Sequence, residues 1–311
     1  MRIAALTGGV GGARFLRGLV DAVDPATVTA IVNVGDDLEV LGLEVSPDLD
    51  SVLYALAGLA DDERGWGRAD ETWHALETVD QLGGETWFQL GDRDLGVHLV
   101  RTQARRAGQP LSAVTGRLAA ALGVEATLLP ATDEPLRTWL DTPNGSFAFQ
   151  EWFVARRHRD PVDRVRFEGA SAARPAPGVL EALHEAELIL VAPSNPFVSI
   201  GPILAVERIR SALERRRRVT CVAVSPLIGG RAVKGPAAGM LQRLQGGTTA
   251  AHLVQCYPGL IDALVIDEAD AADAAAVTAL GVRPIVASTL MRDAAARRAL
   301  AEAALDAVAF A

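Results

Sequence analysis

The sequence is poor in residue types on which whole classes of protein depend. Lys234 is its only lysine, and its formal net charge of −9 argues against a general binder of nucleic acids or membrane surfaces. Cys221 and Cys256 are its only cysteines, too few for a disulfide framework. No apolar run approaches the roughly 20 residues of a membrane helix, and the N-terminal run, residues 3–6, is too short for a signal peptide. We therefore expect a cytoplasmic protein without a nucleic-acid or membrane partner.

What the sequence does have is a regular alternation of short apolar runs with helical patterns. Half of its 311 residues (50%) are hydrophobic, which is enough for one large core, with or without an insertion. Five apolar runs end in glycine-bearing, proline-bearing or acidic loops: residues 2–6, 28–32, 188–192, 219–224 and 264–266. A further run, residues 284–287, precedes a closing alanine-rich helical pattern. Helical patterns follow most of them. This alternation predicts an α/β fold with a doubly wound, mainly parallel, Rossmann-like sheet.

The middle of the chain has a different pattern. Its first half is helical and loop-rich, and its second half carries short β runs around Asn144-Gly145, a dipeptide typical of β-hairpins. We interpret residues 59–178 as an insertion, a helical and β-hairpin cap over the carboxyl edge of the sheet. Residues 1–58 and 179–311 would then form the nucleotide-binding core.

A glycine-rich loop follows the first predicted strand. Glycines allow backbone N–H groups to approach an anion, and the start of the next helix adds a partial positive charge. The loop lacks the Gly-Lys-Ser/Thr of a P-loop and the spacing of the dinucleotide fingerprint, although Asp36 lies where that motif has its ribose-binding acid. Phosphate or nucleotide binding is predicted, with a plain tight turn or a nicotinamide dehydrogenase as alternatives. The candidate ligands are Gly8, Gly9, Gly11, Gly12 and Arg14.

Four aspartates lie within fifteen residues of one another beside this predicted site: Asp36, Asp37, Asp48 and Asp50. Such a density of carboxylates suits a divalent cation that bridges protein and phosphate oxygens, and any one of them is able to accept a proton from an attacking hydroxyl. The alternative is structural, since Asp48 or Asp50 is also placed to cap the helix that follows.

Two later loops also follow predicted strands. They carry small hydroxyl and amide side chains that suit a phosphate or a base, at Ser194, Asn195, Ser199 and Ser225, and the second ends at Lys234. Three such loops on one sheet edge are hard to explain by turn chemistry alone. A fourth motif, Asp92-Arg93-Asp94 after a glycine, either binds substrate or is a solvated turn that neutralises itself.

Taken as a set, these motifs resemble the 2-phospho-lactate transferase family of coenzyme F-420 biosynthesis, most closely its actinobacterial members, which look like phosphoenolpyruvate transferases. The matching stretches run in the family's order: GGVGGARFL at 8–16, NVGDD at 33–37, SPDLD at 46–50, GWG at 65–67, LGDRD at 90–94, APSNP at 192–196, SIG at 199–201 and SPLIG at 225–229.

This resemblance implies an enzyme with two substrates and a Mg²⁺ cofactor. The donor would be a guanosine diphosphate ester of a three-carbon acid, enolpyruvyl or lactyl, and the acceptor the ribityl hydroxyl of the deazaflavin Fo, with release of GMP. We expect enolpyruvyl, because the likeness is closest to the actinobacterial branch. We also expect a homodimer. The alternative is a non-catalytic regulatory protein that binds a nucleotide sugar or dinucleotide.

Residue roles follow from the motifs and the resemblance together. Asp37 and Asp48 are predicted to hold magnesium, with Asp36 and Asp50 as the nearest substitutes. Asp50 and Arg93 are assigned to the acceptor and the chemistry. The remaining substrate-binding residues are predicted to be the glycine loop with Arg14, Asn33, Asp36, Asp48, Trp66, Asp92, Ser194, Asn195, Ser199, Ser225 and Lys234.

Overall fold

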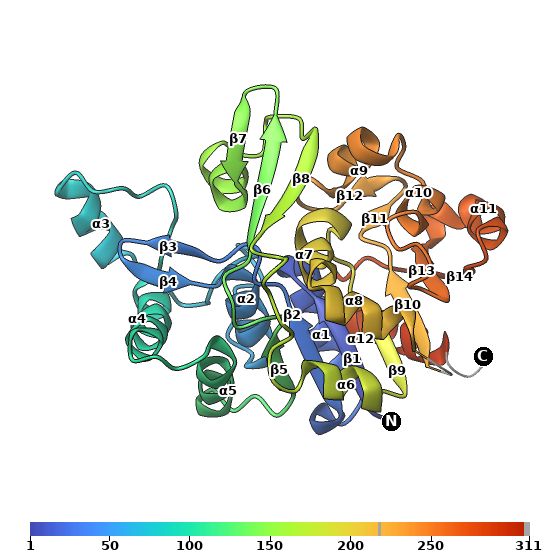
Figure 1. The fold of residues 1–311 in the computed structure, drawn as a ribbon, viewed down its shortest axis with the longest axis horizontal. Helices are drawn as coiled ribbons and strands as arrows, with labels where there is room; N and C mark the ends of the chain where they lie inside the picture. The colour runs from blue at the N-terminus through green and yellow to red at the C-terminus, as the bar shows by residue number, and fades with distance from the viewer. Residues whose placement is uncertain (217–218, 308–311) are drawn as a thin grey trace.

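A seven-stranded parallel sheet forms the centre of the computed structural model, which describes residues 1–216 and 219–307 (Figure 1). The strand order is β14-β13-β10-β9-β1-β2-β5. The strands are β1 (Ile3–Thr7), β2 (Val28–Val32), β5 (Thr127–Pro130), β9 (Leu188–Val191), β10 (Thr220–Val224), β13 (Ala263–Asp267) and β14 (Arg283–Ala287). The predicted Rossmann-like α/β fold is confirmed. The order reverses between β1 and β9, which is where open α/β sheets bind ligands at their carboxyl ends.

Helices flank this sheet in two groups (Figure 1). In one group α1 packs between α2 and α12, and in the other α8 packs against α6 and α7. Helices α9 to α11 follow one another along the chain: α11 packs against β14, α10 against α11, and α9 against α10. Their bounds are α1 (Gly9–Ala22), α2 (Pro47–Leu56), α6 (Val179–Glu185), α7 (Gly201–Ala205), α8 (Glu207–Glu214), α9 (Ala237–Gln245), α10 (Ala250–Val254), α11 (Ala274–Ala279) and α12 (Ala294–Leu305). No helix within the described ranges has both the length and the apolar character to cross a membrane.

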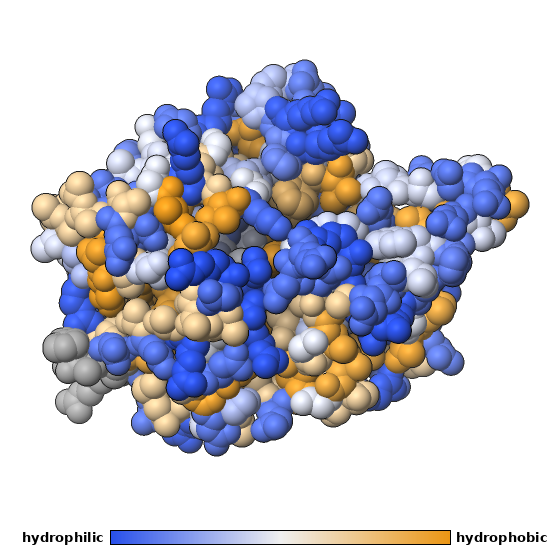
Figure 2. Space-filling model, turned by 180° about the vertical axis from the view of Figure 1, so that it is seen from behind, coloured by the Kyte–Doolittle hydropathy of each residue, from blue (hydrophilic) through white to orange (hydrophobic). Residues whose placement is uncertain are grey.

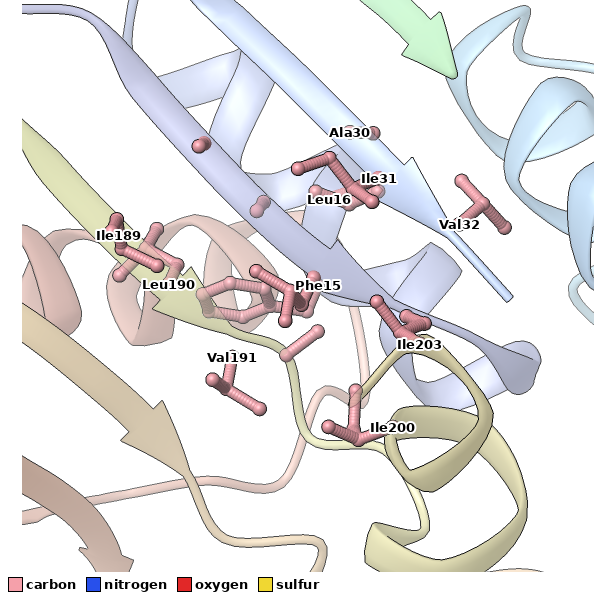
Figure 3. Packing of buried hydrophobic residues seen from close by; sticks show 14 of the residues in the cluster. Phe15, Leu16, Ala30, Ile31, Val32, Ile189, Leu190, Val191, Ile200 and Ile203 are labelled. Atoms are coloured by element: carbon pink, nitrogen blue, oxygen red, sulfur yellow. The ribbon is translucent and has the colours of Figure 1, made fainter. Parts of the chain in front are cut away.

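The hydrophobic core includes residues of α1 and of α6 to α8, so it extends over both faces of the central sheet. All five residues of β1 are buried, as expected of a parallel strand covered on both faces. Figure 3 shows Phe15 and Leu16 of α1 among the side chains of β2 and β9. Because α1 and β1 are held so firmly, the glycine loop between them has a fixed position.

The segments outside this sheet form two projections and several short turns. One projection holds the hairpin of β3 (Leu38–Val40) and β4 (Leu43–Val45), with α3 (His74–Gln81) and α4 (Asp92–Arg106) beside it. The other is an antiparallel sheet of β6 (Arg137–Thr142), β7 (Gly145–Ala148) and β8 (Arg164–Glu168). The hairpin predicted at Asn144-Gly145 is confirmed as β6–β7. The remaining elements are α5 (Leu111–Ala121), β11 (Leu227–Ile228), β12 (Arg231–Ala232), and the short helices η1 (Pro25–Thr27), η2 (Glu151–Ala155), η3 (Pro196–Ile200) and η4 (Glu268–Asp273).

One strand of the central sheet lies inside the range 59–178 that the sequence predicted as an insertion. Strand β5 pairs with β2 at the edge of the sheet, and α5 packs against it. The strand is only four residues long and ends in Pro130, so its pattern resembles the short β runs after it. Proline is tolerated there because the strand is an edge. Only part of the range therefore projects from the sheet, and its separation as a cap stays a prediction.

Candidate functional site

A cavity of about 860 Å³ lies at the carboxyl ends of β1, β9 and β10. The loops after these strands line one side of it. The other side is lined by the start of α2, the Gly65–Gly67 turn, one face of α4 and the segment around η2. This volume suits a ligand of substrate or cofactor size. The switch point of the sheet and the two projections thus enclose one shared site.

The glycine loop joins β1 to α1 at the floor of this cavity. Helix α1 begins at Gly9, and its N-cap residue Gly8 has no side chain to cap it. The Gly9 N–H group interacts with the Asp48 carboxylate, so it is the N–H groups after it in the first turn that are offered to an anion. A Cβ on Gly8 would collide with the Asp48 carboxylate, and one on Gly11 would lie 2.8 Å from the Pro193 carbonyl oxygen. The glycines are therefore needed for close approach, and they bring a carboxylate directly against the helix start.

Asp36 and Asp48 form a buried carboxyl pair in the cavity lining. Asn33 Nδ2 donates to Asp48 Oδ2 at 2.8 Å and to Asp36 Oδ1 at 3.3 Å, and Gln150 Nε2 donates to Asp36 Oδ2 at 3.1 Å. Burial raises the pKa of Asp48 to about 6. Burial and the neighbouring Asp48 and Asp37 charges raise the pKa of Asp36 well above its ordinary value. These carboxyls have amide partners and no cation beside them in the hydrogen-bond set, so they would share a proton or hold a metal ion.

Asp37 has a different environment from its neighbour. It does not line the cavity, and burial raises its pKa to about 7, although Arg137 and Arg101 counteract this. Its Oδ1 is buried without a hydrogen-bond partner. The structure thus brings Asp36, the predicted substitute, against Asp48, and leaves Asp37 beside them with an unpaired oxygen.

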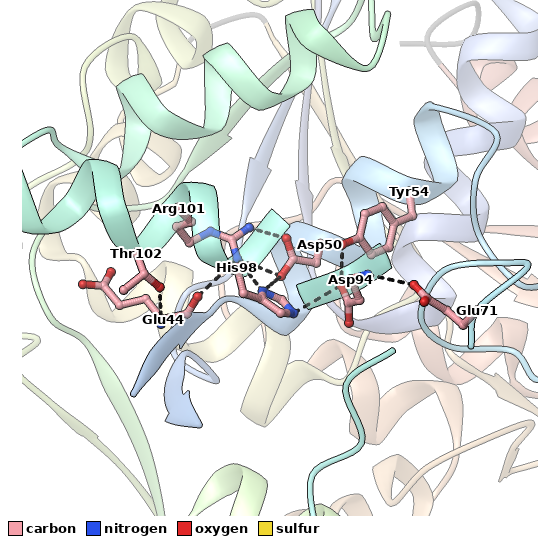
Figure 4. Close-up of polar contacts among 8 residues, drawn as sticks. All are labelled: Glu44, Asp50, Tyr54, Glu71, Asp94, His98, Arg101 and Thr102. Carbon is pink, nitrogen blue, oxygen red and sulfur yellow. Dashed lines mark hydrogen bonds and ion pairs between the residues drawn. The ribbon is translucent and has the colours of Figure 1, made fainter. Parts of the chain in front are cut away.

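Asp50 belongs to a second polar cluster on the α2–α4 wall (Figure 4). Both of its oxygens accept hydrogen bonds from the guanidinium of buried Arg101. Arg101 also contacts His98, whose Nε2 lies 3.2 Å from Asp94 Oδ1, and Asp94 accepts a short hydrogen bond from the Tyr54 hydroxyl. Asp50, unlike Asp36 and Asp48, already has a counter-charge.

Most of the predicted site residues lie around the same cavity. Those that line it are Gly8, Gly9, Gly11, Arg14, Asp36, Asp48, Asp50, Trp66, Ser194, Asn195, Ser199, Ser225 and Lys234. Several hold the loops in shape: Ser194 Oγ donates to the Gly8 carbonyl at 2.7 Å, and Asn195 Oδ1 caps η3. In the part of the chain that the structure describes, the Nδ2 group of Asn195 donates to the Met240 sulfur, at 3.4 Å.

Five predicted residues do not line the cavity: Gly12, Asn33, Asp37, Asp92 and Arg93. Gly12 packs against Ser194, and Asn33 holds the carboxyl pair from behind. Asp92 accepts hydrogen bonds from the N–H groups of His74 and Ala75 and so caps α3. Arg93 is exposed, and its guanidinium lies 3.9 Å from Asp70.

Sequence reasoning missed an aromatic wall and most of the Asp50 cluster. Phe149 stacks on Phe153 at 5.4 Å between ring centroids, and Phe153 stacks on His158 at 5.2 Å; all three line the cavity. Gln150, Tyr54 and His98 were also missed. The available signal was helical spacing, since Asp50 with Tyr54 and Asp94 with His98 are each four residues apart beside a recognised motif.

Comparison with known proteins identifies the family. The model of the family described as 2-phospho-L-lactate transferase CofD matches residues 3–290. The chain belongs to this family. The resemblance stated from the motifs is thus confirmed, and the chain is an enzyme of the transferase class.

Curated relatives are similar along almost the whole chain. A protein named phosphoenolpyruvate transferase from Streptomyces coelicolor is 45% identical over 311 residues, covering 98% of this chain and 97% of the relative. Proteins of the same name from Thermobifida fusca and Mycolicibacterium smegmatis are 42% and 39% identical and likewise cover 98% of this chain. Among solved structures, a Bacillus halodurans protein superposes with a TM-score of 0.64 at 21% identity, covering 98% of this chain and 99% of that one. That last likeness concerns the fold alone.

Proposed function

We propose that this transferase moves a phospho-enolpyruvyl group from its guanosine diphosphate ester to the terminal ribityl hydroxyl of the deazaflavin Fo, in coenzyme F-420 biosynthesis. The observation that carries the proposal is that one cavity is lined by an uncapped helix start, by an uncompensated carboxyl pair and by a stacked aromatic wall. Family membership and the names of the relatives support it.

The donor's diphosphate would lie on the glycine loop. Uncapped N–H groups at a helix start bind anions, and Arg14 and Lys234 add positive charge to the same cavity. The guanosine would lie against the loops after β9 and β10, where Asn195 Nδ2 and the Ser199 hydroxyl are the nearest polar contacts offered.

A magnesium ion fits the carboxyl pair. Asp36 and Asp48 would hold it, because a cation offsets the burial that raises the pKa of both carboxyls and the repulsion from Asp48 that adds to it at Asp36. Asp37 has a buried oxygen without a hydrogen-bond partner beside them. Within the described ranges, no cluster of three or more side chains is arranged to ligate a metal ion. Mg²⁺ is usually bound by one or two carboxylates together with substrate phosphates, so a pair of carboxylates is sufficient. When bound, the ion would neutralise charge on the phosphates.

The acceptor would lie on the opposite side of the cavity. A flat deazaflavin ring suits the wall of Phe149, Phe153 and His158, and Trp66 also lines the cavity. The acceptor hydroxyl oxygen would bond to the phosphorus that bears the three-carbon acid, while the bond from that phosphorus to the bridging oxygen breaks. GMP leaves with that oxygen, and the hydroxyl proton passes to a carboxylate of the site. Asp50 would orient the hydroxyl, since its oxygens are already held by Arg101.

The test is a transfer assay with purified protein, Fo, Mg²⁺ and each guanosine-linked donor in turn, read by product mass. We expect the enolpyruvyl product to form fastest. A product heavier by two hydrogens, formed faster from the lactyl donor, would overturn the choice of acid. No product from any donor would instead favour a regulatory protein that binds a nucleotide.

The oligomeric state is a separate proposal. We propose a homodimer, to be tested by light scattering on the purified chain. The face in Figure 2 has hydrophobic residues in separate patches among hydrophilic ones, so it offers no single apolar surface to which a partner copy would be assigned.

A further inference from the structure

A buried ladder of polar side chains joins α2 to α4 along one wall of the cavity (Figure 4). Asp50 and Tyr54 lie one turn apart on α2, while Asp94, His98 and Arg101 lie on one face of α4. All except Arg101 line the cavity. His98 and Arg101 are each only 1% exposed. The ladder of polar side chains therefore borders the cavity on one side and is shielded from solvent on the other.

Arg101 holds Asp50 as a fork. Its Nη1 donates to Asp50 Oδ2 at 3.0 Å, and its Nη2 donates to Asp50 Oδ1. Burying a guanidinium has a large desolvation cost, and apolar residues at such sites are often at least as stabilising. What a two-point contact adds is a fixed plane and direction for the carboxylate. The arrangement is thus better explained by orientation of Asp50 than by stability.

The position of His98 determines where its proton lies. Its Nδ1 is 3.1 Å from Arg101 Nη1, and a guanidinium has donors but no acceptor, so Nδ1 must offer its lone pair. The hydrogen of the neutral ring is then on Nε2, which lies 3.2 Å from Asp94 Oδ1 but is not aligned for a hydrogen bond with it. Asp94 in turn accepts from the Tyr54 hydroxyl of α2. His98 therefore lies between the Arg101 fork and the Asp94 carboxylate.

We propose that His98, as the neutral Nε2–H tautomer, is a positioning residue that holds Arg101 and thereby fixes the direction in which Asp50 meets the acceptor hydroxyl. This inference rests on the proposed function, in which Asp50 orients that hydroxyl. Arg101 Nη1 also donates to the Glu44 carbonyl, but at 3.5 Å, so without the closer Nδ1 acceptor the guanidinium is held less firmly and Asp50 tilts with it. A misplacement of about 1 Å is able to lower a rate by roughly 100-fold.

Two amide variants test the two nitrogens of the His98 ring separately. His98→Asn places its side-chain oxygen near the Nδ1 position and keeps an acceptor for Arg101. His98→Gln reaches toward Asp94 and keeps that donor instead. We expect His98→Asn to retain kcat within about 3-fold, and His98→Gln to lose about 10- to 100-fold in kcat. The KM for the guanosine donor and the binding of GDP should be unchanged in both, because Asp50 acts on the acceptor.

A merely structural His98 would give another pattern. Both variants would then lose activity in proportion to a lower melting temperature, and an equal loss of kcat in the two would overturn the proposal. So would full activity of His98→Gln.

A second measurement does not depend on turnover. Nitrogen-15 NMR of the five histidine side chains, with His98→Asn to assign the signal, should show an Nε2–H ring with an unprotonated Nδ1 at neutral pH. An imidazolium or an Nδ1–H ring would overturn the positioning role. Absence of transfer by the unmodified protein with every donor would overturn the proposed function instead, whatever the tautomer.

Discussion

The cavity has two pairs of carboxylates, and their surroundings differ. Asp36 and Asp48 receive hydrogen bonds from the amides of Asn33 and Gln150, and burial raises the pKa of both. Asp50 and Asp94, on the neighbouring wall, contact a guanidinium, an imidazole and a phenol. Within residues 1–216 and 219–307, no cationic side chain donates a hydrogen bond to the first pair, whereas Arg101 donates to Asp50 of the second.

This difference indicates which of the two carboxylate pairs a cation would stabilise. A charge-compensated carboxylate gains little from a metal ion, whereas an uncompensated buried pair is stabilised by one. The position of the first pair against the start of α1 places it where a diphosphate would bind. We therefore propose that Asp36 and Asp48 bind the metal and that Asp50 orients the acceptor.

The largest effect should come from Asp48→Asn. Loss of an outer-shell partner of a metal site typically lowers affinity or activity about 10- to 100-fold, and loss of a ligand should exceed this. We expect transfer to fall by more than about 100-fold and excess Mg²⁺ to recover little of it. Rates measured against Mg²⁺ concentration test this. Glu181→Gln, which removes an exposed carboxylate from α6, is the matched control. Full activity of Asp48→Asn at limiting Mg²⁺ would remove this residue from the metal site.

A second large effect concerns the loop beneath the first pair. In Gly11→Ala the new Cβ would lie 2.8 Å from the Pro193 carbonyl oxygen, and such overpacking costs about 1–3 kcal/mol. We expect a lower melting temperature and a smaller upward shift with GDP. Gly116→Ala, in a helix where a Cβ meets nothing within 4 Å, should be neutral or stabilising. An unchanged GDP shift in Gly11→Ala would place the phosphates elsewhere.

The sequence predicted the fold better than the grouping of the carboxylates. Buried parallel strands have continuous apolar runs, so the strands of the sheet other than β5 were recognisable, and loops at their carboxyl ends had to share one edge. Neighbouring aspartates in the chain, however, point in different directions. Asp36 faces the cavity while Asp37 does not, and no periodicity reports such a difference in a loop. His98 and Arg101 are functional candidates only because α4 packs on α2, a contact that one sequence does not show.

The pH dependence of stability should distinguish the pairs next. Without metal, the pKa of Asp48 lies near 6 and that of Asp37 near 7, both above their ordinary value of 3.8. Between the ordinary pKa of 3.8 and the raised pKa of the folded state, these carboxyls bind more protons in the folded protein than in the unfolded chain. The free energy of unfolding therefore falls as the pH rises through this range. We expect the melting temperature of metal-free protein to decrease from about pH 5 to pH 8. Mg²⁺ should restore more at pH 8 than at pH 5.

The slope in this range should flatten in Asp48→Asn, which cannot titrate. A melting temperature that rises over this range, with the same slope in the variant, would contradict the assignment.

A smaller effect is expected on the acceptor side. Phe153→Leu keeps an apolar side chain but removes the ring stacked between Phe149 and His158. Ring contacts of this kind contribute about 0.5–1.5 kcal/mol, or roughly 2- to 12-fold in affinity. Fo binding, followed by its fluorescence, should weaken by this amount while GDP binding stays the same. Weaker GDP binding with unchanged Fo binding would mean that the aromatic wall binds the guanosine donor and not the acceptor.

The smallest effect should be that of Arg93→Ala. The motif predicted a role for Arg93 in the chemistry, whereas its side chain is exposed and outside the cavity lining. Surface substitutions usually change stability by no more than about 0.5 kcal/mol. We expect kcat/KM to change less than about 3-fold. A loss of 100-fold would restore the role inferred from the motif and require the 70–93 segment to move toward the cavity.

The most direct test of the account is calorimetric titration of Mg²⁺ into the protein with bound GDP, compared between Asp48→Asn and Asp50→Asn. The account predicts that Mg²⁺ binding is lost in Asp48→Asn and kept in Asp50→Asn, because only the first residue belongs to the uncompensated pair. Binding kept in Asp48→Asn and lost in Asp50→Asn would contradict it.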